Sequence, residues 1–348
     1  MSPYKLFENL SYVFALLLST RVFIETIKKD IFINKIWFLW IFFAVVFFIF
    51  SRLIYQTPSL LVVTISLNVA IGLWLAQFKG SILYIKVIFF MVASWIISQY
   101  FLSSYSNPLS GIQILDNLIQ GSANHITILI LSLYSTYAFL LLKNTNKVPV
   151  FSSFIVLAIS MMTLGRSAIV ASAFLVFWLL LVSGHKKIIY SLIAFVLLYF
   201  IFVNPTYVDT LSGYLERFES MDMTQDPRIQ ILKKYFSELD TVSLLFGHDV
   251  LFSREVDSSL STHNSFLSIH QGSGILGLLL VLLIFFFELW LILTLSPYAG
   301  ILGAIIIRSF TDSGNFIGGF LMGAVSIGII VATTSSLLIK KSKNAEKA

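Results

Sequence analysis

The sequence of 348 residues contains no cysteine, and only 11% of its residues are charged. The lack of cysteine excludes a thiol nucleophile, a thiolate metal site and any structural disulfide. The scarcity of charge, set against 57% hydrophobic residues, lies far outside the composition of a soluble domain of this length. No stretch separates as a soluble domain of its own. We therefore expect one integral membrane domain over residues 1–348.

Apolar runs long enough to cross a bilayer recur along the chain, since a membrane helix needs about 20 residues. The runs are continuous and do not alternate between apolar and polar residues, which excludes the strands of a membrane barrel. They predict an all-α polytopic membrane protein with about 11 transmembrane helices, within a range of about 10 to 12. No small-residue cleavage site follows the first run, so no cleavable signal peptide is expected. The expected spans are residues 7–27, 36–54, 59–78, 82–102, 124–142, 149–164, 167–184, 188–204, 265–289, 298–311 and 315–338.

The lysines set the expected orientation, because basic residues gather in the short cytoplasmic loops of membrane proteins. They fall on one alternating set of connections, which we assign to the cytoplasm: Lys28, Lys29, Lys35, Lys79, Lys143, Lys147, Lys186, Lys187, Lys340, Lys341, Lys343 and Lys347. This assignment accounts for the net charge of +6, which in a soluble protein would indicate a nucleic acid partner. We expect no such partner here. The long polar loop over residues 205–262 then faces the extracytoplasmic side.

The loop over residues 205–262 holds 10 of the 17 acidic residues and 3 of the 7 arginines. Apolar residues at helical spacing predict two short helices in it, over residues 207–218 and 228–239. Asp226 and Pro227 suit the N-cap and the first position of the second helix. Arg228 would then lie in the first turn, where the helix dipole disfavours a cation. An anionic ligand would account for this placement, and so would the Asp226 carboxylate.

Arginines near the outer ends of the expected spans form a second group of candidates. Arg166 lies in a polar hinge between two apolar runs, and Arg308 lies near the end of another run. A guanidinium at the edge of the hydrocarbon is costly unless it is paired or faces an aqueous cavity, and its planar donors suit phosphate oxygens. For Arg308, an ion pair with Asp312 is the structural alternative. Arg217 lies beside Glu216 in the loop, so it is either a substrate contact or a solvated ion pair.

His263-Asn264, nine residues and then Gly274-Ile275-Leu276-Gly277 form the pattern H-N-x9-G-x-x-G at the entry to an expected span. With the large outward loop before it, this pattern resembles the C-terminal signature of the bacterial O-antigen ligase and O-antigen polymerase (Wzy) superfamily. Leu164-Gly165-Arg166-Ser167 is similar to the G-R-S/T element of that family, and Arg228 followed by Phe246-Gly247 is similar to its loop pattern. The resemblance extends in pattern from Thr163 to Gly277, while the N-terminal third shares only hydropathy.

The resemblance implies a glycosyltransferase that uses an undecaprenyl-diphosphate-linked oligosaccharide. Its site would lie in the bacterial cytoplasmic (inner) membrane and face the periplasm or the outside. The polymerase moves a growing glycan onto a newly flipped repeat unit, and the ligase moves the finished glycan onto lipid A-core. The length of the sequence and the absence of an extra domain favour the polymerase. Membrane lipid and a polysaccharide chain-length regulator are the implied partners, and no cofactor and no metal are expected. A metal site formed by His248, Asp249 and His263 stays open as an alternative, although the sequence has no H-E-x-x-H or Asp-rich metal motif.

The residue types meet the demands of such a transfer. Departure of a lipid diphosphate develops negative charge that fixed cations must offset, and three arginines are candidates for this role: Arg166, Arg228 and Arg308. The acceptor hydroxyl must lose a proton, and His263 is the expected base because histidine titrates near neutral pH. Asn264 would orient His263 or the acceptor. His270, two turns further along, would contact the lipid diphosphate or pair with another helix.

Two other classes of protein stay open as alternatives. A transporter would show ionisable residues at the bilayer midplane and internal repeats with broken helices. The expected spans have no ionisable residues at their midplanes, and the two halves of the chain show no repeat. Polar residues concentrate in one outer loop, which favours an interfacial enzyme. A membrane scaffold without enzymatic activity would leave the H-N-x9-G-x-x-G pattern and Arg166 unexplained.

Overall fold

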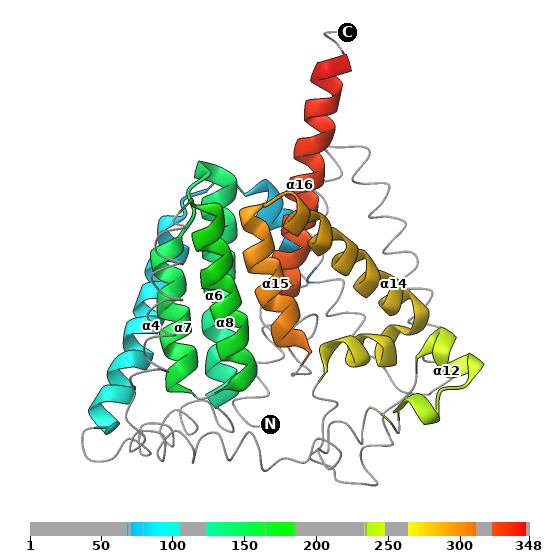
Figure 1. Cartoon of the computed structure of the whole chain (residues 1–348), viewed down its shortest axis with the longest axis horizontal. Helices are drawn as coiled ribbons and strands as arrows, with labels where there is room; N and C mark the ends of the chain where they lie inside the picture. Colours follow the sequence, from blue (N-terminus) through cyan, green and yellow to red (C-terminus); the bar gives the residue numbers. More distant parts are fainter. Residues whose placement is uncertain are drawn as a thin grey trace, which may run out of the picture.

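The computed structural model describes residues 68, 71–78, 80–104, 123–163, 165–184, 233, 235–247, 264–310 and 322–345. Within these ranges the regular structure is α-helical, and no residue is part of a strand. Most of the helices stand side by side in one bundle, and the end of α16 projects beyond the others (Figure 1). The prediction of an all-α protein is therefore confirmed for the described residues.

Seven of the described helices coincide with predicted spans. They are α4 (Leu83–Ser104), α6 (Ala123–Thr145), α7 (Val150–Met162), α8 (Arg166–Val182), α14 (Ser265–Leu293), α15 (Pro297–Ser309) and α16 (Met322–Ala345). The short helix α12 (Thr241–Phe246) lies in the predicted loop. Residues 71–77, in the predicted span 59–78, are also helical. The predicted spans 7–27, 36–54 and 188–204 lie outside the described residues, so the count of about 11 spans stays a prediction.

Two of the described helices are long and apolar enough to cross a membrane, over Leu83–Leu102 and His125–Thr145. The first of these, in α4, exposes most of its large apolar side chains, including Met91 and Trp95. Exposed apolar area of this extent is rare on soluble monomers, because water in contact with it costs free energy. The second part of α14 has a similar exposed row that includes Leu282, Leu283 and Phe286. Both surfaces favour contact with lipid.

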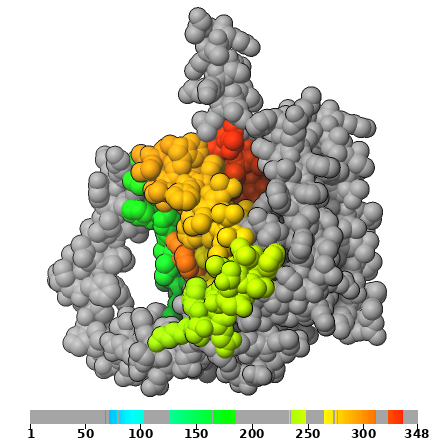
Figure 2. All heavy atoms as spheres, turned by 90° about the vertical axis from the view of Figure 1, so that its right-hand side faces the viewer, coloured from blue at the N-terminus to red at the C-terminus, as the bar shows by residue number. Residues whose placement is uncertain are grey.

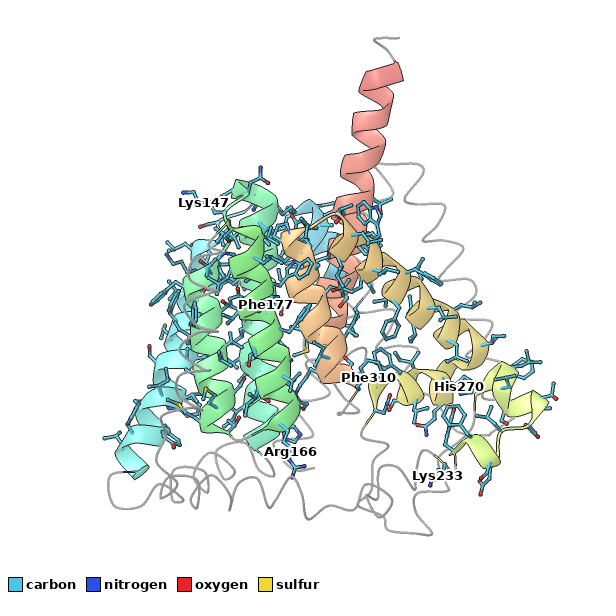
Figure 3. The ribbon with its side chains drawn as sticks, viewed as in Figure 1. Lys147, Arg166, Phe177, Lys233, His270 and Phe310 are labelled. Carbon is cyan, nitrogen blue, oxygen red and sulfur yellow. The ribbon has the colours of Figure 1, made fainter. Side chains whose placement is uncertain are left out.

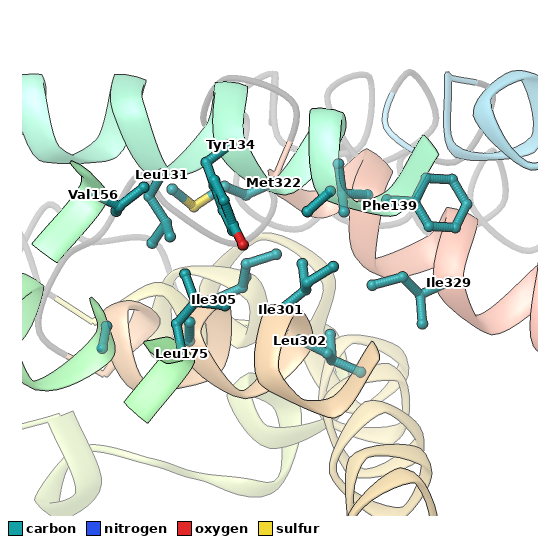
Figure 4. Close-up of a cluster of buried hydrophobic side chains, with 14 of the residues drawn as sticks. Leu131, Tyr134, Phe139, Val156, Leu175, Ile301, Leu302, Ile305, Met322 and Ile329 are labelled. Carbon is teal, nitrogen blue, oxygen red and sulfur yellow. The ribbon is translucent and has the colours of Figure 1, made fainter. Parts of the chain in front are cut away.

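The core of the bundle lies between α6, α7, α8, α15 and α16 (Figure 4). Its side chains come from helices far apart in the sequence, and the central residues are almost fully buried: Leu131, Tyr134, Phe139, Val156, Leu175, Ile301, Leu302, Ile305, Met322 and Ile329. Gly300 and Gly303 let α15 approach α8 closely, because a Cβ at Gly300 would lie 3.0 Å from Cδ1 of Trp178. The two glycines thus allow close packing of α15 against α8.

Most of the buried hydroxyl side chains in the bundle donate to carbonyl oxygens of their own helices, and Ser135 in α6 is an exception whose hydroxyl has no hydrogen-bond partner among the described residues. Ser132 donates to the carbonyl oxygen of Ile128 at 2.7 Å, and Ser172 donates to that of Ala168 at the same distance. The same bond, four residues back along the helix, recurs at Thr136, Ser160, Ser309 and Ser326. A hydroxyl group bonded in this way needs no water, so these helices can lie in apolar surroundings at little cost.

Candidate functional site

Arg308 is buried at one end of the bundle, where three helix ends meet. It lies in the last turn of α15, and its side chain is only 2% exposed. One terminal nitrogen donates to the hydroxyl of Ser167 in α8, and the other donates to that of Thr127 in α6 at 3.3 Å. Arg308 thus connects the ends of α6, α8 and α15 with a charged group. Asp312, its expected ion-pair partner, lies outside the described residues.

Arg166 is exposed at the first position of α8, directly before the serine that Arg308 contacts. Gly165 is the N-cap and supplies no side-chain hydrogen bond to the start of the helix. Arg166 and Phe310, two residues after Arg308, lie at the same end of the bundle, and Lys147 lies at the opposite end (Figure 3). The structure therefore brings together two arginines that the sequence places 142 positions apart.

Asn264 is the N-cap of α14. Its side-chain oxygen accepts from the backbone N–H of Phe266 at 2.9 Å and of Leu267 at 3.1 Å. The ring of Phe266 lies against that of Phe310, with centroids 4.8 Å apart. The start of α14 therefore lies beside the end of α15 that carries Arg308. Capping accounts for an asparagine at this position, so a role toward substrate is not needed to explain it.

His270 is buried in the first part of α14, and both of its ring nitrogens have protein partners. Nδ1 pairs with the hydroxyl of Tyr235, and Nε2 lies 3.0 Å from the carbonyl oxygen of Leu244 in α12. Only 2% of the side chain is exposed. Of the two roles expected for His270, these contacts favour pairing with another segment over contact with a lipid diphosphate.

Gly274, the first glycine of the G-x-x-G pair, is the kink of α14. Its φ of 55° and ψ of −141° interrupt the helix, in a region that residues with a Cβ avoid. A Cβ there would overlap the carbonyl oxygen of Leu245 and would lie 2.7 Å from the carbonyl carbon of Phe246. The backbones of α12 and α14 are thus in direct contact, and the two helices lie side by side in Figure 2. Gly274 therefore allows both the kink of α14 and its close contact with α12.

Three predicted site residues lie outside the described residues: His263, Arg217 and Arg228. His263 directly precedes Asn264, so the chain itself keeps it within one residue of the start of α14. Of the predicted helix over 228–239, Lys233 and residues 235–239 are described. Lys233, Tyr235, Phe236 and Ser237 are helical, whereas Glu238 lies in a turn and Leu239 is outside any helix.

Glu288 is a buried carboxyl group that the sequence reasoning missed. It lies in α14 with 6% of its side chain exposed, and neither carboxylate oxygen has a hydrogen-bond partner among the described residues. A Cβ at Gly303 of α15 would lie 2.7 Å from its Oε1. α14 therefore carries a buried ionisable residue within its apolar part. The signal was visible in the sequence, since Glu288 interrupts an apolar run and α14 continues past it to Leu293.

Comparison of the chain with models of known protein families, with curated proteins and with solved structures found no match.

Proposed function

We propose that the chain is a membrane glycosyltransferase that polymerises a surface polysaccharide, as the O-antigen polymerases do. Its donor and acceptor are glycans linked to undecaprenyl diphosphate, and the reaction takes place at the outer face of the bacterial inner membrane. The proposal includes the full set of about 11 spans and the outward loop over residues 205–262. A chain-length regulator is its expected protein partner.

The convergence of residues at one end of the bundle is the observation that supports this proposal. Arg308 contacts Ser167, which adjoins Arg166, and Phe310 contacts Phe266 near the start of α14. Two cations and the Asn264 cap, which His263 directly precedes in the sequence, therefore lie in one neighbourhood, although they come from three separate parts of the sequence. A lipid diphosphate and a sugar hydroxyl need this combination of fixed positive charge and a nearby base.

The proposed reaction transfers a glycosyl group between two oxygens. The acceptor hydroxyl oxygen attacks the anomeric carbon of the donor, and the bond from that carbon to the diphosphate oxygen breaks. Undecaprenyl diphosphate leaves with the electron pair, and the hydroxyl proton passes to His263. The exposed Arg166, together with Arg228, binds the departing diphosphate. The buried Arg308 adds positive charge near this position and donates a hydrogen bond to Ser167.

Deletion of the gene tests the proposed function and separates polymerase from ligase. Loss of a polymerase leaves single repeat units on the terminal acceptor. Loss of a ligase leaves full-length chains on undecaprenyl diphosphate. Normal polymer in both fractions would exclude both enzymes.

Substitutions at the site test the roles of its residues. We expect His263→Ala and Arg166→Ala to abolish elongation while the protein accumulates normally. Arg166→Lys should retain partial activity, because lysine keeps the charge but lacks the planar fork of donors. Lys147→Ala is the matched control, since it removes an exposed cation from the opposite end of the bundle. Long chains from either alanine variant of the site would remove that residue from the mechanism.

A transporter is the second candidate function, and Glu288 is the observation that favours it. Buried ionisable residues within membrane helices commonly mark pathways for ions or protons. Glu288→Gln keeps the size of the side chain and removes its charge. If the chain is a polymerase, this variant should make polymer of normal length. Loss of export of completed repeat units, with intact polymerisation of units already outside, would support the transporter instead.

A further inference from the structure

The first part of α14 is a separate short helix. The kink at Gly274 divides Ser265–Leu293 into residues 265–273 and a longer apolar part, and the two run in different directions in Figure 1. The short helix begins at the Asn264 cap, directly after His263. Its direction therefore decides where His263 lies relative to Arg166 and Arg308.

Tyr235 and His270 connect the middle of this short helix to the loop. The Tyr235 hydroxyl is the donor to Nδ1 of His270, and Nε2 then carries the proton that is donated to the Leu244 carbonyl oxygen at 3.0 Å. One tautomer of the ring satisfies both bonds. The two rings also meet edge to face, with centroids 5.8 Å apart. Tyr235 is 5% exposed, so the pair is shielded from water.

Two glycines add a second point of attachment at the end of the same helix. Gly247 ends α12 with a φ of 90°, and a Cβ there would lie 2.7 Å from the carbonyl oxygen of His270. Gly274 meets the backbone of Leu245 and Phe246 in the same way. No side chain separates the two backbones, so α12 and residues 265–273 dock as one unit. The capping box of Asp240 and Ser243 fixes the start of α12.

We infer that Tyr235 and His270 are positioning residues that hold the short helix of α14, and with it His263, against the arginine end of the bundle. Six residues of helix separate Asn264 from His270, which is about 9 Å. A rotation of the short helix at His270 would therefore move its Asn264 end, and with it the Phe266 ring that lies against Phe310. The inference rests on the proposed function for its catalytic consequence, but the position of the short helix can be measured without activity.

The lack of cysteine in the chain allows a direct measurement of this position. A protein with Phe266→Cys and Phe310→Cys carries thiols where two rings lie 4.8 Å apart, so a short bis-methanethiosulfonate reagent should link them in membranes. Tyr235→Phe removes only the hydroxyl that bonds to His270. We expect it to slow cross-linking roughly fivefold, the effect of losing one net hydrogen bond. His270→Leu should slow it further, and His270→Gln, which keeps a donor and an acceptor, should restore much of the rate.

Tyr134→Phe is the matched control. It also removes a buried tyrosine hydroxyl, which donates to the carbonyl oxygen of Pro149 at 3.1 Å, but it lies between α6 and α7, away from the short helix. Each tyrosine and histidine variant is also made without the added cysteines, and glycan chain length is measured in cells. Shorter chains for Tyr235→Phe but not for Tyr134→Phe, with recovery in His270→Gln, support the inference.

Cross-linking of the Tyr235→Phe protein at the rate of the Tyr134→Phe protein would overturn the inference. Failure of the proposed function gives a different result. If deletion of the gene leaves the glycan normal while Tyr235→Phe still slows cross-linking, the positioning role stands and the polymerase proposal fails.

Discussion

Gly274→Ala tests the docking of α12 on α14, because the substitution adds one methyl group where two backbones meet. The φ of 55° and ψ of −141° at Gly274 strain any residue with a Cβ, at a cost of about 1–3 kcal/mol. The new Cβ would also overlap the carbonyl oxygen of Leu245 and lie 2.6 Å from its carbonyl carbon. Backbone cannot move aside as a flexible side chain can, so overpacking adds about 1–3 kcal/mol.

Gly184→Ala separates these two contributions. Gly184 also has a positive φ, of 77°, but no atom lies within 4 Å of the position of its Cβ. Its substitution should therefore cost only the strain, roughly 1–2 kcal/mol. The difference between the two variants measures the overlap at Leu245 together with the difference in backbone strain between the two sites. A sum of about 2–6 kcal/mol at Gly274 is a large part of the 5–15 kcal/mol that typically stabilises a folded protein.

The measurement is the thermal unfolding of each variant in detergent, followed by tryptophan fluorescence and by the fraction that stays monodisperse after heating. We expect the midpoint to fall several degrees further for Gly274→Ala than for Gly184→Ala. The Gly274→Ala protein should also lose the Phe266–Phe310 cross-link, because the short helix can no longer dock. Equal unfolding midpoints for the two variants would show that α12 and the kink of α14 do not touch. The inference that the short helix is held in a fixed position would then be wrong.

Three further substitutions test other contacts of the fold in the same unfolding assay. Lys143 donates from Nζ to the carbonyl oxygens of Leu75 at 2.8 Å, Ala76 at 3.0 Å and Phe78 at 2.5 Å. Lys143→Met removes these bonds, so it should lower the free energy of unfolding by about 1–3 kcal/mol. The exposed Lys147→Met is its control and should change little. Glu288→Met should leave stability unchanged or raise it, because it replaces a buried carboxyl without a described partner by an apolar side chain of similar size. Trp178→Phe should cost about 1–3 kcal/mol, since it removes the indole N–H that donates to the carbonyl oxygen of Ser296 at 2.8 Å and opens space beside Gly300. The same oxygen still accepts from the backbone N–H of Ala299 at 3.1 Å.

Each of these substitutions has a result that would contradict the reasoning. Equal stability of the two lysine variants would mean that Lys143 does not cap the helix over residues 71–77. Marked destabilisation by Glu288→Met would mean that the carboxyl group has a partner beyond the described residues. A Trp178→Phe protein as stable as the parent would mean that α8 and α15 do not depend on this bond.

Helix positions followed from run length alone, because a continuous apolar run has few alternatives to a helix in lipid. The predicted run 82–102 became α4, and the run 167–184 became α8, with boundaries shifted by at most two residues. The run 265–289 was extended to Leu293, which places Glu288 inside the helix instead of at its end. Four more apolar residues follow the predicted end at Leu289, and the helix continues through them until the polar Thr294 and Ser296.

Contacts between distant residues could not be predicted in this way. Arg308 was expected at an outer helix end, and its bonds to Ser167 and Thr127 follow from the packing of α15 against α8 and α6. Tyr235 lies in the loop helix predicted over residues 228–239, and nothing in that segment indicated His270, 35 residues away, as its partner. A hydropathy pattern predicts which faces of a helix are buried. It does not predict which two buried polar side chains will contact each other.

The sequence by itself determined an all-α chain with apolar helices, a polar segment before α14 and the residues that can bear charge at one end. These features depend on composition and on spacing within single helices. Only the tertiary structure decided that Arg308 is buried while Arg166 is exposed, that Gly274 is a kink pressed against α12, and that His270 is held by Tyr235. The physical reason is that hydrogen bonding and close packing act over a few ångströms in space, and the residues concerned are brought within that range only when the helices assemble.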